Sequence, residues 1–233
     1  PGVEHQTIEG FGSMIKQDVC CDQQDLADDS YLQMIHDDLG VRVIRIWTPM
    51  MMEPTNDNGD PNSLDWSKLD FAGSGGDRAT WYFWAINRLK QFGDMKFIAS
   101  VLSPPSWMKD NNSLVNGGHL LPSMRAELAE NLVAFYRAVQ ESCGVNLYGI
   151  SLQNEPAFEE WYGSCVYTAE EYRDALKVLG ARFAQEGIQT KLHGADDMLS
   201  RITVTPYAGF INADPEARQY LDAFSGHGYT DGV

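Results

Sequence analysis

The sequence lacks several features that would define other classes of protein. It contains no run of roughly 18 or more apolar residues, so no segment is long enough to span a bilayer as a helix. Basic residues are scarce: 17 Lys and Arg stand against 33 Asp and Glu, which gives a net charge of -16. Nucleic acids and anionic membrane surfaces are therefore disfavoured as partners, because both are bound through clustered positive charge. A neutral or mildly acidic polysaccharide or glycoconjugate remains compatible with this charge.

Motifs of several catalytic chemistries are also absent. The five histidines show neither HxH nor HExxH spacing and the four cysteines contain no CxxC pair, so a zinc site is not indicated. The sequence has no GxSxG nucleophile elbow, and the GFG segment that starts at Gly10 does not extend to a GxGxxG loop. We therefore expect no cofactor and no metal.

The four cysteines are an even number, which is compatible with disulfides and with a secreted or extracellular location. Cys143 precedes and Cys165 follows a predicted strand over 147–153, and the length of this strand exceeds the reach of a disulfide. We expect Cys165 to pair with Cys20 or Cys21 instead. Four reduced cysteines are the alternative.

Strands and helices alternate along the chain. The predicted strands are apolar runs that end in Gly, Pro or polar residues, and they cover 7–12, 41–47, 96–102, 147–153, 191–195 and 223–229. The predicted helices have apolar residues at helical spacing and cover 25–39, 78–92, 124–142 and a segment that begins at Thr168. Glu171 completes a capping box with Thr168. Alternation of this kind predicts a parallel sheet covered by helices.

Two parallel architectures compete, a (β/α)8 TIM barrel and an open doubly wound sheet. Polar residues gather after the second, third, fourth and sixth predicted strands, and function spread over many strand ends favours the barrel. A barrel needs eight strands, whereas about six can be identified in this sequence. Two strand edges would then be left unpaired. We therefore expect residues 1–233 to be the N-terminal portion of a single catalytic domain, with strands seven and eight missing.

The fourth predicted strand ends in the tripeptide Asn154-Glu155-Pro156. Pro156 stops the strand and leaves a carboxylate and an amide at its C-terminal end, where barrel enzymes carry catalytic residues. A carboxyl group there can protonate a glycosidic oxygen, and the amide of Asn154 can bond to a sugar hydroxyl. The alternative is an exposed Glu155 before a turn-forming proline.

Further candidate site residues belong to neighbouring predicted strands. Arg45 lies inside the second strand, where a charged side chain normally has a carboxylate partner. Trp107 follows the third strand, and its indole face can stack on the C–H face of a sugar. His227 and Tyr229 are two positions apart and so share one face of the sixth strand. Each of these residues also has a purely structural alternative. Arg45 could form an ion pair, Trp107 could cover the end of the barrel core, and His227 could be a core residue whose hydrogen bonds are all made within the protein.

Asp196 and Asp197 end the fifth predicted strand. Paired carboxylates can perform acid–base work or hold a metal ion. Adjacent aspartates more often form a solvated turn or a helix N-cap. We interpret this pair in that second way.

Four segments together resemble glycoside hydrolase family 30, which includes glucuronoxylanases, endo-β-1,6-glucanases and glucosylceramidases. They are GFG at 10–12, VIRIW at 43–47, SPPSWMK at 103–109 and GVNLYGISLQNEP at 144–156, in order over nearly the whole chain. The resemblance implies a retaining (β/α)8 hydrolase with an accessory β-sandwich. It implies that Glu155 is the general acid/base and that Asn154 and Trp107 contact the cleaved sugar. It also implies that Arg45 supports the nucleophile and that His227 and Tyr229 are the family's His and Tyr after strand six.

The family's nucleophile is a Glu at the end of strand seven, which this sequence does not reach. Glu53, Glu159 and Glu160 lie on other loops, and the accessory β-sandwich is largely missing as well. Glu155 is therefore expected to be one of two catalytic carboxyl groups, which lie about 5–5.5 Å apart in retaining enzymes. Burial and the second carboxylate are expected to raise the pKa of Glu155 so that it can act as an acid.

The sequence thus predicts a retaining O-glycoside hydrolase that cleaves β-linked polysaccharide, with endo action and a xylanase-like specificity favoured by the fourth strand. Specificity of the β-1,6-glucanase, galactanase or glucosylceramidase type stays open, because loops set the choice of substrate. Two other classes also remain. One is a catalytically inactive carbohydrate-binding fragment, and the other is a metal-dependent barrel hydrolase, which the histidine spacing disfavours.

Overall fold

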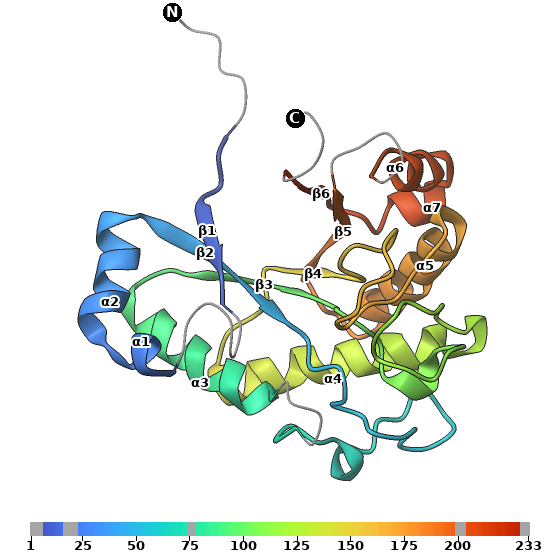
Figure 1. The fold of residues 1–233 in the computed structure, drawn as a ribbon, viewed down its shortest axis with the longest axis horizontal. Helices are drawn as coiled ribbons and strands as arrows, with labels where there is room; N and C mark the ends of the chain where they lie inside the picture. Colours follow the sequence, from blue (N-terminus) through green and yellow to red (C-terminus); the bar gives the residue numbers. More distant parts are fainter. Residues whose placement is uncertain (1–6, 16–22, 74–77, 199–203, 229–233) are drawn as a thin grey trace, which may run out of the picture.

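A six-stranded parallel sheet forms the centre of this protein in a computed structural model that describes residues 7–15, 23–73, 78–198 and 204–228. The strands of these residues are β1 Phe11–Met14, β2 Val41–Trp47, β3 Lys96–Ser100, β4 Gly149–Ser151, β5 Lys191–Met198 and β6 Ala223–His227. Each strand pairs in parallel with the next along the chain (Figure 1). Sequential order without reversal distinguishes a barrel from a doubly wound sheet, whose order reverses at a switch point. The predicted barrel class is therefore confirmed over six strands.

Helices connect the strands and lie in an arc outside the curved sheet (Figure 1). Those of the described residues are α1 Gln23–Ala27, α2 Asp29–Gln33, α3 Ala79–Leu89, α4 Arg125–Cys143, α5 Ala169–Gln185, α6 Val204–Ala213 and α7 Pro215–Arg218. The helices of a barrel stand on its outer side in this way, which leaves the strand ends free for function. No helix in the described part of the chain is both long and apolar enough to cross a membrane.

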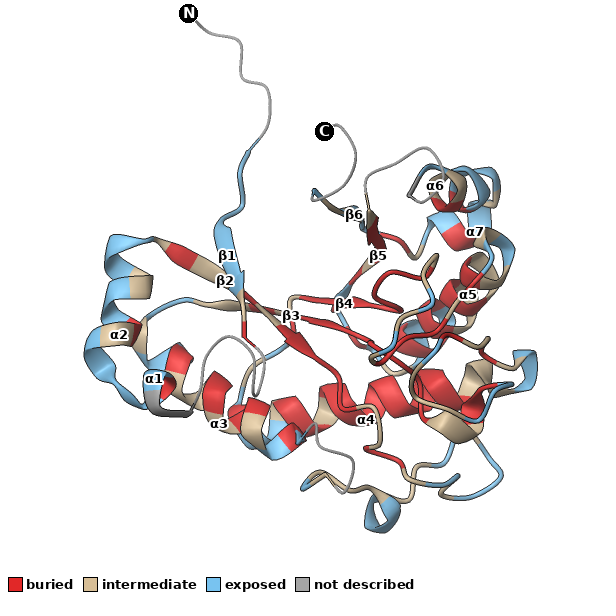
Figure 2. Ribbon diagram, viewed as in Figure 1, coloured by how far each residue is buried: buried red, intermediate tan, exposed pale blue. Residues whose placement is uncertain are grey.

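The core lies between the sheet and the helices that cover it, and α3, α4 and α5 all contribute buried side chains (Figure 2). The apolar side predicted for α4 is confirmed: Leu128, Leu132, Phe135 and Val139 are each at most 1% exposed. Gly144 ends the helix with a φ of 65°, a left-handed conformation that glycine adopts without steric cost. The central strands β3, β4 and β5 are largely buried, which fits their near-continuous apolar sequence, whereas the edge strands β1 and β6 are mostly exposed.

Several predicted boundaries are wrong. The single helix expected over 25–39 is three pieces, because the side chain of Asp28 accepts from the N–H of Ser30 and begins α2, and a π-helical turn covers Met34–Asp38. β1 begins at Phe11 rather than at residue 7, and β4 covers only three residues. The capping box of α5 is confirmed, since Thr168 and Glu171 each bond to the other's backbone. Hydrophobic periodicity located these elements, and side-chain bonds at the ends decided their limits.

The two cysteines within the described residues are free and buried. They are Cys143 and Cys165. The expected disulfide from Cys165 is therefore not formed in this structure, and its predicted partners Cys20 and Cys21 lie outside the described residues. Burial raises the pKa of the Cys165 thiol to about 12, so this thiol is held in its unreactive protonated form.

Candidate active site

Glu155 lies just beyond the C-terminal end of β4. Its backbone N–H donates to the carbonyl of Asp196 on β5 at 2.9 Å, and the N–H of Asn154 donates to the carbonyl of Val101 at 2.7 Å. Glu155 has a φ of 49°, in the left-handed region that non-glycine residues rarely occupy. Conformations of this kind persist where neighbouring structure enforces them and are concentrated at functional sites. Bonds to both adjacent strands thus fix the direction of the Glu155 side chain.

Both carboxylate oxygens of Glu155 accept a hydrogen bond. His227, the last residue of β6, lies with its Nδ1 2.8 Å from Oε1, and the hydroxyl of Tyr162 donates to Oε2 at 3.1 Å. The residue is only 6% exposed. His227 therefore contacts the candidate catalytic carboxylate, and the alternative of an exposed Glu155 is ruled out. Tyr229, predicted to share this face, lies outside the described residues.

The carboxylate of Asp196, which lies on β5, contacts side chains from β2, β3 and β6. Its Oδ2 accepts from Arg45 at 2.9 Å and from the hydroxyl of Ser100 at 2.7 Å, and its Oδ1 lies 3.4 Å from Nε2 of His227. Burial alone would raise its pKa, but the bond to His227 and the charge of Arg45 hold the pKa of Asp196 well below its ordinary value. Our interpretation of Asp196 and Asp197 as a solvated turn or N-cap is wrong, because both lie buried inside β5.

His227 is shared between two carboxylates. Burial lowers the pKa of its imidazole, but the bonds to Asp196 and then to Glu155 outweigh burial and raise that pKa to about 9. The ring is therefore cationic at neutral pH. Nδ1 then donates to Glu155, and Nε2 lies at ion-pair distance, 3.4 Å, from Asp196.

Arg45 connects the carboxylate of Asp196 to the side-chain amide of Asn154. Its Nη2 donates to Oδ1 of Asn154 at 2.7 Å, its Nε donates to Ser100 at 3.1 Å, and its guanidinium lies 4.3 Å from the centre of the Trp47 ring. The carboxylate partner that the sequence predicted for Arg45 is Asp196. Because the arginine binds the amide oxygen, the NH2 group of Asn154 is the end that remains to donate to a ligand.

Trp107 is bonded to the loop after β2. It belongs to a short 3-10 turn, Ser106–Met108, after β3, and its indole N–H donates to the backbone carbonyl of Glu53 at 2.9 Å. The ring is partly buried, so one edge is fixed to the loop after β2 while part of its surface faces outward. This placement is compatible both with stacking on a sugar and with a capping role for Trp107.

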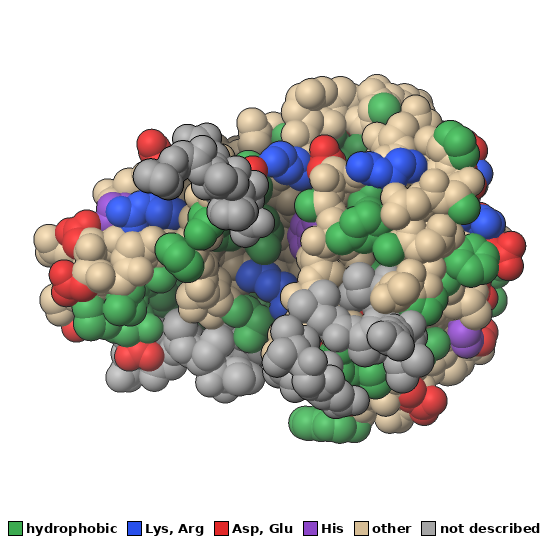
Figure 3. All heavy atoms as spheres, turned by 90° about the horizontal axis from the view of Figure 1, so that it is seen from above, with side chains coloured by type: hydrophobic (Ala, Val, Ile, Leu, Met, Phe, Trp, Pro, Cys, Tyr) green, Lys and Arg blue, Asp and Glu red, His purple; other side chains and the backbone are tan. Residues whose placement is uncertain are grey.

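The structure therefore brings together Arg45, Asn154, Glu155 and His227 from three strands, β2, β4 and β6. Seen from above, the surface is hollowed near its middle, and basic and His side chains are visible in the hollow (Figure 3). Sequence reasoning missed Ser100 and Tyr162. Ser100 ends β3 and pairs in register with Trp47, two residues beyond Arg45 on β2, which is a usable signal, whereas Tyr162 lies on a loop that offered none. In the described residues, the single metal-compatible group of side chains lies elsewhere, at Glu53, Asp57 and Glu127.

A parallel barrel sheet with a buried, doubly bonded carboxylate at a strand end is the arrangement of a (β/α)8 hydrolase. The chain belongs to glycosyl hydrolase family 30, because the model of that family's TIM-barrel domain matches residues 8–233. The resemblance drawn from the four sequence segments is thereby confirmed.

Several known proteins are similar to this chain. "Putative glucosylceramidase 2" of Caenorhabditis elegans is 26% identical over 97% of this chain, and the lysosomal acid glucosylceramidase of Mus musculus is 28% identical over 59% of it. The structure of the endo-β1,6-glucanase BT3312 superposes with a TM-score of 0.78 at 22% identity and covers 98% of this chain. The chain spans 47% of the length of the C. elegans relative and 53% of the glucanase.

Proposed function

We propose that the whole protein is a retaining β-glycoside hydrolase in which Glu155 is the general acid/base. The observation that carries this proposal is the environment of Glu155, whose two buried oxygens are bonded to His227 and Tyr162 at the C-terminal end of β4. A carboxyl group held rigidly in this position can deliver a proton to a glycosidic oxygen. The catalytic nucleophile is proposed to be a Glu outside residues 1–233.

The proposed reaction has two steps. In the first, the nucleophile attacks the anomeric carbon, the bond to the leaving oxygen breaks, and Glu155 gives its proton to that oxygen. In the second, Glu155 as carboxylate removes a proton from water, the water oxygen attacks the anomeric carbon, and the bond to the nucleophile breaks. His227 as a cation stabilises the carboxylate form of Glu155 between the steps. The amide NH2 of Asn154, oriented by Arg45, is proposed to donate to a sugar hydroxyl, and Trp107 to stack on the sugar.

The proposed substrate is a β-linked polysaccharide, with the endo-acting, xylanase-like specificity that the fourth strand favoured and a secreted location. The net charge of -16 suits a neutral or mildly acidic polymer rather than a polyanion. A glucosylceramidase-type activity is the second candidate, because "Putative glucosylceramidase 2" of C. elegans is similar to this chain over 97% of this chain's residues. Xylan, β-1,6-glucan and glucosylceramide, offered to the whole protein in parallel, distinguish these specificities.

Glu155→Gln in the whole protein tests the catalytic role. We expect turnover of an unactivated β-glycan to fall roughly 10²–10⁴-fold, the usual size of acid–base assistance. The first step on an aryl glycoside with an acidic leaving group should fall much less, because that leaving group needs little protonation. Glu159→Gln is the matched control, since Glu159 is an exposed carboxylate on the following loop and should leave both rates unchanged. Equal rates for wild-type and Glu155→Gln protein on the unactivated glycan would refute the assignment.

A further inference from the structure

Four acidic side chains gather between the loop after β2 and the first half of α4, in what we term the loop–α4 cluster. Glu53 and Asp57 belong to the loop, and Glu127 and Glu130 lie about one turn apart on the helix. One carboxylate oxygen from each of Glu53, Asp57 and Glu127 lies within 4.8 Å of the other two. Glu53 and Glu130 are 0% exposed and Glu127 is 6% exposed. The loop–α4 cluster therefore holds several negative groups away from water.

Several carboxylate oxygens of the loop–α4 cluster receive no hydrogen bond. Glu53 accepts from the backbone N–H of Asp57 at 3.1 Å and from the amide of Asn131 at 3.3 Å. By contrast, Oδ1 of Asp57, Oε2 of Glu127 and both carboxylate oxygens of Glu130 are buried without a hydrogen-bond donor among the described residues. Native proteins rarely leave buried carboxylate oxygens unpaired, because the lost hydration is costly. Glu130 in particular is a fully buried acid with two oxygens to satisfy.

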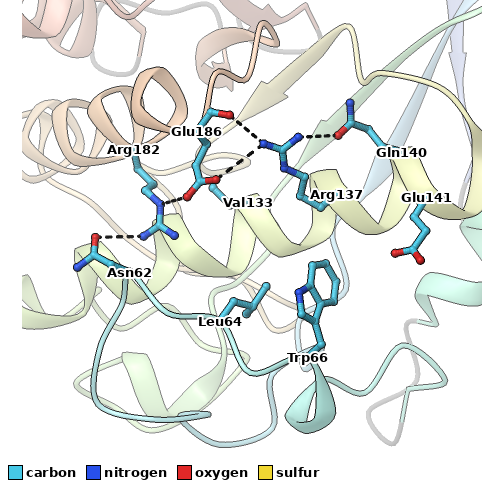
Figure 4. Close-up of a pocket in the computed structure, with 9 residues that line it drawn as sticks. All are labelled: Asn62, Leu64, Trp66, Val133, Arg137, Gln140, Glu141, Arg182 and Glu186. Carbon is cyan, nitrogen blue, oxygen red and sulfur yellow. Dashed lines mark hydrogen bonds and ion pairs between the residues drawn. The ribbon is translucent and has the colours of Figure 1, made fainter.

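Basic side chains do not neutralise the negative charge of the loop–α4 cluster either. In the described part of the chain, none of these four carboxylates forms an ion pair with Lys, Arg or His. Arg182, which attracts Glu130 only weakly, is bonded instead to Glu186 at 3.0 Å and to Asn62 at 3.5 Å (Figure 4). Burial, and then repulsion from the other three acids, raises the pKa of Glu130 to about 7. The loop–α4 cluster thus needs either protons or a cation from solution.

We propose that the loop–α4 cluster binds a divalent cation with the chemistry of Ca²⁺, which ties the β2–α3 loop to α4. Ca²⁺ takes roughly six to eight oxygen ligands at about 2.3–2.6 Å, so two ligands of one ion lie up to about 5 Å apart. The 4.8 Å limit on the three ligand oxygens is within that span. Mg²⁺ holds its ligands at about 2.0–2.1 Å and demands a stricter geometry. A purely oxygen donor set without His or Cys also selects a hard cation.

The spacing of the His and Cys residues predicts no metal site. The loop–α4 cluster uses carboxylates that are far apart along the chain, so no short motif reveals it. The cation also supports the candidate active site indirectly, since Glu53 accepts the indole N–H of Trp107 through its backbone carbonyl at 2.9 Å. The ion acts as a structural element there and takes no part in the proposed hydrolysis.

Calcium titration of the chelator-stripped whole protein tests this proposal. By isothermal calorimetry we expect one Ca²⁺ per chain with a dissociation constant in or below the roughly 10⁻⁴–10⁻³ M range of extracellular calcium modules, and weaker binding of Mg²⁺. The melting temperature should rise with calcium concentration, because the ion binds the folded state. No binding at about 10 mM Ca²⁺, tenfold above the weak end of that range, would overturn the proposal. So would a melting temperature that ignores calcium and rises only as the pH falls below about 7, which would show neutralisation by protons.

Two variants separate the ion site from a general effect of charge. Glu127→Gln should lose the calcium response and, in calcium-free buffer, should melt higher than the wild type because one repelling charge is gone. Glu141→Gln on the same helix is the control, since Glu141 is exposed and outside the loop–α4 cluster, and it should keep the full response. An equal loss in both variants, or no loss in Glu127→Gln, would count against the proposal. Calorimetry on the wild-type protein decides the matter even if Glu127→Gln does not fold.

Discussion

At the scale of single residues, one protonated imidazole holds the candidate active site together. His227 lies 2.8 Å from Glu155 and 3.4 Å from Asp196, and Arg45 lies on the far side of Asp196 at 2.9 Å. Two cations thus alternate with two buried carboxylates. Each buried charge is paired, and removal of one partner would leave another charge uncompensated in a poorly solvated place.

The raised pKa of His227 predicts that stability depends on pH. Its folded-state pKa of about 9 exceeds the ordinary value of about 6.5. The stabilising contribution is therefore complete below about pH 6.5 and is lost as the pH rises through about 9. Urea unfolding at a series of pH values from 6 to 10 should show a loss on the order of a few kcal/mol in the wild type that His227→Gln lacks. Parallel curves for the two proteins would contradict the assignment of this titration to His227.

The sequence predicted most of this site because its members follow strand ends in order. Arg45, Asn154, Glu155 and His227 could be assigned to one edge of a parallel sheet without coordinates. Asp196 could not, because two adjacent aspartates after a short apolar run look like a turn. Only the pairing of β5 with β6 shows that the strand continues through residues 196 and 197 and buries them.

At the scale of elements, hydrophobic periodicity found the strands and the long helices, and local polar bonds set where they end. The apolar spacing over 25–39 fits one helix, but the side chain of Asp28 caps a new start inside that range. β4 ends at Ser151, yet the N–H groups of Asn154 and Glu155 beyond it still bond to the carbonyls of Val101 and Asp196 on either side. Hydrophobic periodicity indicates which face of a helix or strand is buried. It does not indicate where a polar side chain bonds to the backbone and so ends the element.

The capping box of α5 leads to a prediction about stability. Thr168 accepts from the N–H of Glu171 at 3.1 Å, and the carboxylate of Glu171 accepts from the N–H of Thr168 at 2.8 Å. Thr168→Ala removes one of these bonds, and we expect it to lower the free energy of unfolding by about 1 kcal/mol. Thr80→Ala, at an exposed position inside α3, is the matched control and should change stability little. Denaturant unfolding of both variants makes the comparison, and equal effects would show that the cap is not the cause.

At the scale of the whole molecule, the sheet is open between β1 and β6 within the described residues. Phe11 on β1 is 68% exposed and Phe224 on β6 is 41% exposed, so each edge strand presents an aromatic side chain to water. Exposed apolar edge strands favour pairing with further strands. The chain also covers about half of the structures that it resembles, 53% in the case of the glucanase BT3312. We propose that the remaining strands of the whole protein pair with these two edges and carry the nucleophile.

This proposal predicts a difference between residues 1–233 on their own and the whole protein. A retaining mechanism needs two carboxyl groups about 5–5.5 Å apart, and the acids that surround Glu155 here are committed elsewhere. Asp196 is bound by Arg45, Ser100 and His227, and Asp197 accepts from the N–H of Ala157 at 2.9 Å. We therefore expect reducing-sugar release from the whole protein and none from residues 1–233, which should also bind a hydrophobic dye at their exposed edges. Hydrolysis by residues 1–233 that disappears in Glu155→Gln would place the second catalytic carboxyl group within this chain, with Asp197 as the first candidate to replace.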